Sequence, residues 1–313
     1  MITRKKDILI VVVGPTAVGK TTIAIDLAER LGGEIISADS QLFYRGFNIG
    51  TAKPTIEEMR GIPHHLIDVT DLQNPWSISI FKSSVYKLVE EITKRDHLPI
   101  LVGGTGQYIR GVIENWTIPE FANDENLRQA IINWGKTIGS QELHRKLAIL
   151  DPKAADFIDY RNLRRTVRAL EVIFRTGYPF SKQRSNQVVP FELIMIGINR
   201  PRDELYKRVD ERIEKMIQNG FIDEVKQLMV QGQEDEIIRS GPIGYSEIVK
   251  IIKGECSLEE SIIEIKRKTR ILVRRQTNWF KPDDERIKWF WVDKEILPNI
   301  LSYIKDKLSE LNN

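Results

Sequence analysis

The residues with the clearest chemical meaning form a glycine-rich octapeptide near the start of the chain. It reads Gly14-Pro15-Thr16-Ala17-Val18-Gly19-Lys20-Thr21 and follows the apolar run Ile8–Val13. This spacing, between a short strand and a helix, is typical of a loop whose backbone N–H groups hold phosphate oxygens. Lys20 adds a positive charge, and the Thr21 hydroxyl can bind Mg²⁺. The motif predicts a phosphorylated substrate, but kinases, NTPases and some transferases share it.

A carboxylate is expected beside this phosphate site. Asp39 follows the predicted strand Glu34–Ala38 and opens the segment Asp39-Ser40-Gln41-Leu42. The carboxyl ends of parallel strands meet at one edge of a sheet, so Asp39 should lie near the phosphate loop. A carboxylate next to phosphates is repelled unless it assists Mg²⁺ or accepts a proton from a nucleophile. The position favours a functional role over that of a turn or N-cap residue.

Other polar residues are expected at the same edge. Thr105, after Gly103-Gly104, could present its hydroxyl to the phosphate loop or cap the next helix. Lys53 could serve the site or be an ordinary surface lysine. Asp68 resembles the metal-side aspartate of phosphate-loop proteins, although the apolar run before it is short.

Two arginines, Arg208 and Arg212, are spaced i, i+4 on a predicted helix. They share one face and could both turn toward a phosphate, as bidentate anion binders do. Salt bridges to Glu204 or Glu211 are the alternative. A zinc site is not expected at His64 and His65, because successive strand residues point to opposite faces.

The elements that would position these residues alternate between strands and helices. This alternation predicts an α/β fold with a parallel sheet covered by helices. Residues 119–190 show helical periodicity and no strand, which predicts an all-helical insertion between core segments 1–118 and 191–313. The polar stretch Gln231–Gly244 is expected to be a loop. The strands are predicted at Ile8–Val13, Glu34–Ala38, His65–Val69, Pro99–Val102, Leu193–Ile198 and Trp289–Val292.

Composition describes an ordinary water-soluble protein. Hydrophobic residues make up 41% of the 313, no apolar run has the length of a membrane span, and the first residues lack the features of a signal peptide. The single cysteine, Cys256, excludes an internal disulfide and suits a cytoplasmic protein, for which we expect a monomer. The net charge of +3 does not by itself imply nucleic acid. Two basic clusters stand out, one at Arg161–Arg168 and one at Lys266–Arg275.

Taken together, several motifs resemble the tRNA dimethylallyltransferase family over nearly the whole chain. Each motif after the phosphate loop is more discriminating than the loop itself. A single cysteine provides no cysteine-based zinc finger of the kind that eukaryotic relatives carry, which favours the bacterial type. The motifs are Gly14–Thr21, Asp39-Ser40 with Tyr44, Gly50–Pro54, Gly103-Gly104-Thr105, Arg168-Ala169-Leu170-Glu171, Gly244-Tyr245, and Arg275-Gln276 with Trp279-Phe280.

The resemblance implies transfer of a dimethylallyl group from dimethylallyl diphosphate to N6 of adenosine 37 in the tRNA anticodon loop, with Mg²⁺ present. It implies that Asp39 is the general base, with Lys20 and Thr105 near the reacting centre and Thr21 on the metal. Gly14–Thr21 and either Arg208 or Arg212 would bind the diphosphate. The residues it implies in tRNA contact are Asp39, Ser40, Gln41, Leu42, Thr105, Arg164, Arg165, Arg168, Gly244 and Tyr245. Trp279, among basic residues, could stack on a base.

Three alternatives stay open from the sequence. A small-molecule kinase would use ATP in the same loop, and a prenyltransferase acting on free AMP or ADP would leave the basic clusters without a purpose. An RNA-binding protein without catalysis would not need the set Lys20, Thr21 and Asp39.

Overall fold

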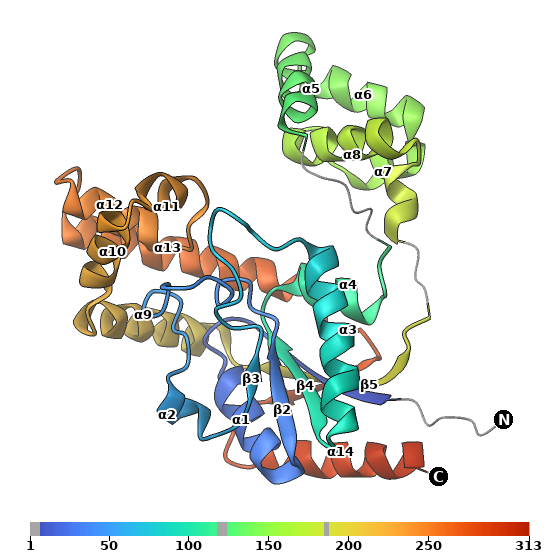
Figure 1. The fold of residues 1–313 in the computed structure, drawn as a ribbon, viewed down its shortest axis with the longest axis vertical. Coiled ribbons are helices and arrows are strands. Elements are labelled where there is room, and N and C mark those ends of the chain that lie inside the picture. Colours follow the sequence, from blue (N-terminus) through green and yellow to red (C-terminus); the bar gives the residue numbers. More distant parts are fainter. Residues whose placement is uncertain (1–6, 118–123, 185–187, 313) are drawn as a thin grey trace. The chain divides into compact units, whose positions relative to one another are not determined.

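The computed structural model describes residues 7–117, 124–184 and 188–312. The described residues up to Ile113 and from Pro190 on contain a parallel sheet with helices around it (Figure 1). Its six strands lie in the order β3-β2-β4-β1-β5-β6. The sheet confirms the predicted α/β fold. Its strands are β1 (Asp7–Val13), β2 (Gly33–Ser37), β3 (His64–His65), β4 (Leu98–Gly103), β5 (Phe191–Asn199) and β6 (Ile287–Trp291).

The centre of the sheet brings the predicted motifs to one edge. β1 lies between β4 and β5, and its residues from Leu9 to Val13 are fully buried, which explains their continuous apolar run. Val13 pairs in register with Gly103 and Gly197, so the loops that follow these strands start side by side. The phosphate loop therefore shares an edge with the residues that follow β4.

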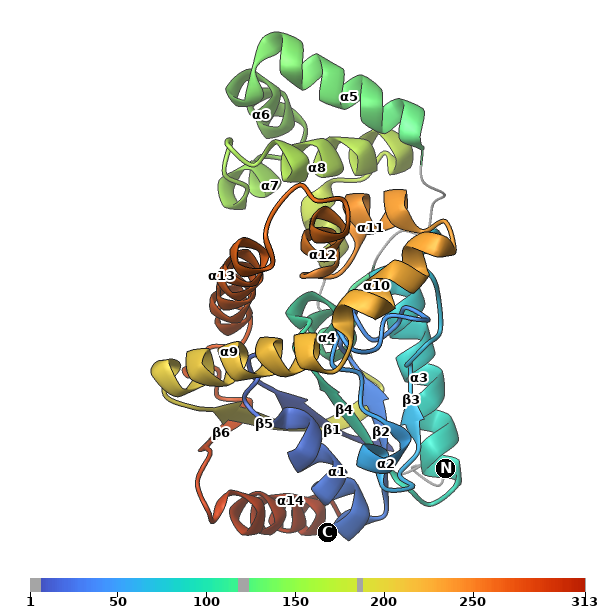
Figure 2. The same ribbon diagram turned by 90° about the vertical axis from the view of Figure 1, so that its left-hand side faces the viewer.

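Helices cover both faces of this sheet. α1 and α14 pack on one face, where Ile10 and Val12 share a core with Leu27 and Ile300. α1 connects β1 to β2, and α3 connects β3 to β4 in the opposite direction across the sheet. Because both connections are right-handed, α3 lies on the other face (Figure 2). The helices are α1 (Lys20–Leu31), α2 (Ile56–Met59), α3 (Ile78–Lys94), α4 (Gly106–Ile113) and α14 (Ile296–Asn312).

A second group of helices gathers beyond the carboxyl ends of the strands. Figure 2 shows α9 crossing this edge and α10–α13 beyond it. The group comprises α9 (Arg202–Gln218), α10 (Phe221–Val230), α11 (Glu234–Ser240), α12 (Tyr245–Ile252) and α13 (Leu258–Thr277).

The insertion, Glu114–Val189, is a separate compact unit. Its described residues contain helices and no strand, as predicted, and they bury a core of their own around Leu143, Leu147 and Leu170. The predicted boundary at 118/119 lies outside the described residues, and the return to the sheet is at Pro190. The elements are α5 (Glu125–Ile138), α6 (Ser140–Leu150), α7 (Pro152–Phe157), α8 (Leu163–Thr176) and the 3₁₀ helix η1 (Phe180–Arg184).

Some predicted elements are wrong. The strand expected over His65–Val69 stops at His65, because Leu66 and Asp68 adopt left-handed φ angles of 62° and 56° that a strand cannot contain. The loop expected over Gln231–Gly244 contains α11. Helix formation continues there because the acidic residues Glu234, Asp235 and Glu236 occupy its first turn. Among the described residues, no helix is long and apolar enough to cross a membrane.

Candidate active site

The phosphate loop has the backbone shape that its glycines predict. Gly19 has a φ of 107°, and a Cβ on Gly14 would lie 2.5 Å from the carbonyl oxygen of Ile198. Only glycine fits both conditions. The loop leads into α1, whose N-terminal turn carries no side-chain cap, so its N–H groups point toward the loop. This is the geometry that binds an anion.

Lys20 lies inside this loop and interacts electrostatically with two other charged side chains. Its Nζ donates a hydrogen bond of 2.8 Å to the Pro15 carbonyl. Burial lowers the pKa of Lys20 to about 8; Asp39 opposes this shift and Arg212 adds to it. Burial also lowers the pKa of Arg212, again against the effect of Asp39. The structure thus brings Lys20, Asp39 and Arg212 together at one edge of the sheet.

The segment that carries Asp39 is fastened to the residues after β4. The Asp39 Oδ1 accepts a 3.1 Å bond from the Gln41 N–H. The Thr105 hydroxyl accepts a 3.0 Å bond from the Ser40 N–H and lies 3.3 Å from the Ser40 hydroxyl. Thr105 therefore joins these two loops, whereas the capping alternative would direct its hydroxyl to the N–H groups of α4.

A buried polar atom lies in the same segment. The side-chain carbonyl of Gln41 is inaccessible to solvent and has no hydrogen-bond partner among the described residues. Buried acceptors are nearly always satisfied in folded proteins, so an unsatisfied one next to Asp39 is a feature expected of a site that receives a donor from a ligand.

Both arginines of α9 reach the site. The Arg208 Nε donates to the Ala17 carbonyl in the phosphate loop at 2.8 Å, and the Arg212 Nη2 donates to the Thr51 carbonyl at 3.0 Å. Glu204, a predicted salt-bridge partner, pairs with Arg200. Arg208 thus contacts the phosphate loop itself, and Arg212 is the one that interacts with Asp39.

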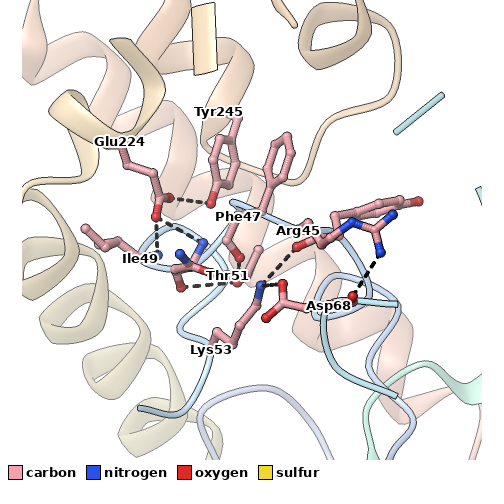
Figure 3. A network of polar contacts seen from close by, with 10 residues as sticks. Arg45, Phe47, Ile49, Thr51, Lys53, Asp68, Glu224 and Tyr245 are labelled. Atoms are coloured by element: carbon pink, nitrogen blue, oxygen red, sulfur yellow. Dashed lines mark hydrogen bonds and ion pairs between the residues drawn. The ribbon is translucent and has the colours of Figure 1, made fainter. Parts of the chain in front are cut away.

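Lys53 is not an ordinary surface lysine. Only 6% of its side chain is exposed; its Nζ donates to the Tyr44 carbonyl at 2.9 Å and pairs with Asp68 (Figure 3). The same pairing gives Asp68 a structural partner in place of a metal. Arg45 donates to the Asp68 carbonyl at 3.1 Å, so the turn around Lys53 is held to the segment after β3.

The two histidines before Asp68 also have structural partners. The His64 Nδ1 lies 2.8 Å from the Ile62 carbonyl, and His65 pairs with Glu34 at 2.6 Å. Within the described ranges, no group of three or more His, Cys, Asp or Glu side chains could hold a metal ion.

The sequence alone does not indicate a functional role for two residues, Gln276 and Glu224. The Gln276 Oε1, at the end of α13, accepts a 2.7 Å bond from the Thr16 N–H in the phosphate loop. The sequence places Gln276 in a family motif but indicates no role for it, because nothing local shows that its partner is 260 residues away. The second is Glu224, which accepts bonds from the N–H groups of Asn48, Ile49 and Gly50.

The burial of Tyr245 contradicts a predicted tRNA contact. Its side chain is fully buried, and its hydroxyl donates to Glu224 at 2.6 Å. Gly244 adopts a φ of 102° beneath the Phe221 ring. The Tyr245 side chain therefore offers no surface to RNA and serves packing. Trp279 packs against Gly106, where a Cβ would lie 2.2 Å from its Cγ, so its ring helps to join α13 to α4.

Much of the basic cluster on α13 is neutralised by neighbouring carboxylates. The exposed basic residues of this cluster are Arg267, which pairs with Glu264, and at its end Arg274 and Arg275. In the insertion, Arg164 is exposed, Arg165 covers the Phe157 ring at 5.3 Å, and Arg168 pairs with the buried Glu171 at 2.9 Å. The pairs on α13 are Lys266 with Glu214, Arg267 with Glu264, Lys268 with Glu247, and Arg270 with Asp210.

Known proteins are similar to this chain in sequence and fold. The profile of the family described as IPP transferase matches residues 42–283. The tRNA dimethylallyltransferase of Thermoanaerobacter sp. strain X514 is 42% identical over 311 residues, which cover 96% of this chain and 98% of the relative. That of Carboxydothermus hydrogenoformans is 43% identical over 299 residues, covering 95% and 96%.

Solved structures agree with these relatives. The tRNA isopentenylpyrophosphate transferase of Bacillus halodurans superimposes with a TM-score of 0.72 at 41% identity, covering 98% of both chains. A eukaryotic dimethylallyltransferase acting on tRNA gives a TM-score of 0.82 at 25% identity, covering 97% of this chain and 80% of its own. The family profile matches most of this chain, and relatives in the family align with nearly all of it. The chain therefore belongs to the IPP transferase family.

Proposed function

We propose that this protein transfers a dimethylallyl group from dimethylallyl diphosphate to N6 of adenosine 37 in the tRNA anticodon loop, releasing diphosphate. The observation that carries the proposal is that the Asp39 carboxylate interacts electrostatically with Lys20 of the phosphate loop. A phosphate cradle alone would suit many reactions; a carboxylate next to it suits a reaction that also removes a proton. The names of the relatives support the same reaction.

The phosphate loop would bind the leaving group. An allylic diphosphate departs when its developing negative charge is stabilised, and N–H groups and cations fixed in advance stabilise such charge without reorganising. Lys20, Arg208 and Arg212 lie around the loop and would supply three positive charges.

Mg²⁺ would fit this site through Thr21. The Thr21 hydroxyl is exposed in the first turn of α1, next to Lys20. Mg²⁺ prefers oxygen ligands and usually takes one or two from the protein, with phosphate oxygens and waters completing its octahedron. When bound, it would neutralise part of the charge on the diphosphate.

Asp39 would act on the nucleophile. The lone pair of adenine N6 is delocalised into the ring, so removal of an N6 proton assists its attack on the allylic carbon. The Asp39 Oδ1 is engaged by the Gln41 N–H, and we assign proton acceptance to Oδ2. The unsatisfied carbonyl of Gln41 would receive a donor from the extruded base, as flipped bases are bound through their polar edges.

The substrate RNA would need a basic surface outside this centre. Arg274 and Arg275 are exposed next to Gln276, which contacts the phosphate loop, and Arg164 is exposed on the insertion. We propose that these residues contact tRNA phosphates. We also propose that the protein acts as a monomer in the cytoplasm, where tRNA is available.

One assay tests the proposed reaction. The protein is incubated with dimethylallyl diphosphate and unmodified tRNA, with AMP and ATP as rival acceptors or substrates, and the digested nucleosides are analysed by mass. We expect prenylated adenosine from tRNA alone. Prenylated AMP, or phosphoryl transfer from ATP, would contradict the proposal.

A further inference from the structure

A turn formed by residues 47–53 is held by side chains from α10 and α12 (Figure 3). The Glu224 Oε2 accepts bonds from the N–H groups of Asn48 at 3.0 Å and Ile49 at 2.7 Å, and its Oε1 accepts from Gly50 at 3.2 Å. The hydroxyl of Tyr245 donates to the same Oε1 at 2.6 Å. One carboxylate thus receives four donors.

The chemistry of this contact requires a carboxylate. Three successive backbone N–H groups that converge on one point form an anion-binding nest, and here the anion belongs to the protein. A carboxylate only accepts hydrogen bonds, whereas a glutamine amide would direct its own N–H groups at one set of donors. Burial and the neighbouring Glu224 raise the pKa of Tyr245, so its hydroxyl remains a donor.

Packing fixes the same turn. A Cβ on Gly50 would lie 2.2 Å from the Phe221 ring and 2.6 Å from the Tyr245 ring. The backbone of the turn therefore lies directly on these two rings. The Thr51 hydroxyl donates a 2.6 Å hydrogen bond to the Phe47 carbonyl, which joins the two ends of residues 47–51.

The other end of this turn reaches the candidate active site. The Thr51 carbonyl accepts a 3.0 Å bond from the Arg212 Nη2, and Arg212 interacts electrostatically with Asp39 and Lys20. A shift of the turn at Glu224 would move the carbonyl that orients the Arg212 guanidinium. The contacts form one chain from α10 to the site.

We propose that Glu224 is a positioning residue for the transfer reaction, acting through the 48–51 backbone on the orientation of Arg212. The inference rests on the proposed function. Glu224 contacts the 48–50 backbone and Tyr245, and through this backbone it determines where the guanidinium lies. Replacing a residue that orients a functional group typically costs about 10–100-fold in affinity or activity.

A double-mutant cycle tests this inference. Glu224→Gln, Arg212→Met and the double variant are compared in kcat/KM for prenyl transfer to tRNA and in Kd for inorganic diphosphate. We expect Glu224→Gln to lower kcat/KM by about 10–100-fold in the wild-type background and by less than about twofold in the Arg212→Met background. Equal losses in both backgrounds would overturn the inference.

Matched variants separate positioning from general stability. Val225→Ala removes apolar packing from the next, fully buried residue of α10. It should lower the free energy of unfolding while showing no coupling to Arg212→Met. Tyr245→Phe keeps the Glu224 carboxylate and three of its four hydrogen-bond donors. It should lower kcat/KM by less than Glu224→Gln does, and this loss should also disappear in the Arg212→Met background. If Glu224→Gln does not fold, the Tyr245→Phe cycle decides the question.

The two readouts distinguish this inference from the proposed function. If the wild type binds diphosphate and the double-mutant cycle shows coupling in Kd, but no prenyl group is transferred to tRNA, the proposed reaction is contradicted and the role of Glu224 is supported. If the wild type is active but the losses caused by Glu224→Gln and Arg212→Met are additive, the reaction is supported and the role of Glu224 is contradicted.

Discussion

Three charged side chains from distant parts of the sequence interact at the candidate active site. Lys20 comes from the start of α1, Asp39 follows β2, and Arg212 is on α9. The negative charge of Asp39 raises the pKa of both Lys20 and Arg212, whereas burial lowers both pKa values. When all three side chains are charged, one carboxylate and two cations leave a net positive charge, which a bound diphosphate would neutralise.

Asp39→Asn should separate chemistry from folding. Asparagine keeps an Oδ1 that can accept the Gln41 N–H, so the turn should survive, but the base is lost. We expect kcat to fall by roughly 10²–10⁴ while the Kd for tRNA stays within about twofold. Single-turnover kinetics and filter binding measure the two quantities. A large loss of tRNA affinity with normal turnover of the bound complex would instead make Asp39 a recognition residue.

Lys20 should make diphosphate binding depend on pH. Its pKa is lowered from 10.5 to about 8, so below pH 8 both the folded and unfolded states carry the charge, and the folded state bears the cost of burying it. Between pH 8 and 10.5 the folded protein loses the proton first, and its ligand-free stability rises with pH. Diphosphate binding needs the charged form of Lys20, so the affinity of the protein for diphosphate should fall above pH 8 by up to about tenfold per pH unit.

Calorimetric titrations with inorganic diphosphate from pH 7 to 10 check this dependence. Lys20→Arg is the control, because arginine stays charged over the whole range and any ionisation of the ligand affects both proteins equally. A wild-type profile that parallels that of Lys20→Arg would show that Lys20 does not titrate in the site.

At the scale of elements, α13 is fastened to the phosphate loop through Gln276. The Thr16 N–H is bonded to its amide carbonyl, and a Cβ on Gly104 would come within 2.5 Å of its amide nitrogen. The end of α13 thus packs on the loops after β1 and β4 together. These contacts relate a long C-terminal helix directly to phosphate binding.

Gln276→Met should weaken diphosphate binding without unfolding the protein. It keeps the volume of the side chain but removes the acceptor for Thr16, a hydrogen bond worth about 1 kcal/mol. We expect Kd for diphosphate to rise by about fivefold. Asn278→Ala, two residues further along at an exposed position, is the matched control. An unchanged Kd would mean that the loop keeps its shape without α13.

The elements that could be predicted are those with local signals. β1 and the phosphate loop follow from an apolar run and its glycines, and Asp39 follows from its position after a strand. The strand at His65–Val69 failed because the left-handed backbone of Leu66 and Asp68 leaves no trace in residue type. Glu224 and Gln276 could not be found because their partners lie 174–176 and 260 residues away.

At the scale of the whole molecule, the insertion is a structurally separate unit. It has its own core around Leu143 and Leu170, and its two ends are linked by a 3.0 Å bond from the Asn115 side chain to the Val188 carbonyl. The sheet of the other unit is complete without it, because β4 and β5 both pair with β1.

Replacement of Glu114–Val189 by a short glycine linker should therefore leave a folded protein. We expect diphosphate Kd within about threefold of the full chain. We expect tRNA modification to fall by at least about 100-fold, because the tRNA phosphate contacts that we propose for the insertion would be lost. Circular dichroism, calorimetry and the nucleoside assay measure these properties. Loss of diphosphate binding in a folded variant would show that the insertion contributes to the small-molecule site.

The long sequence separation between the phosphate loop and Gln276 also bears on synthesis at the ribosome. The loop is translated early, yet Arg208 and Gln276, which contact its backbone, follow 191 and 260 residues after their partners. A nascent chain that ends before α9 has a glycine loop without either contact, and one that ends before α13 lacks the Gln276 contact. Premature termination would thus yield fragments that compete poorly for the prenyl donor, and incomplete copies would not sequester this metabolite from the finished enzyme.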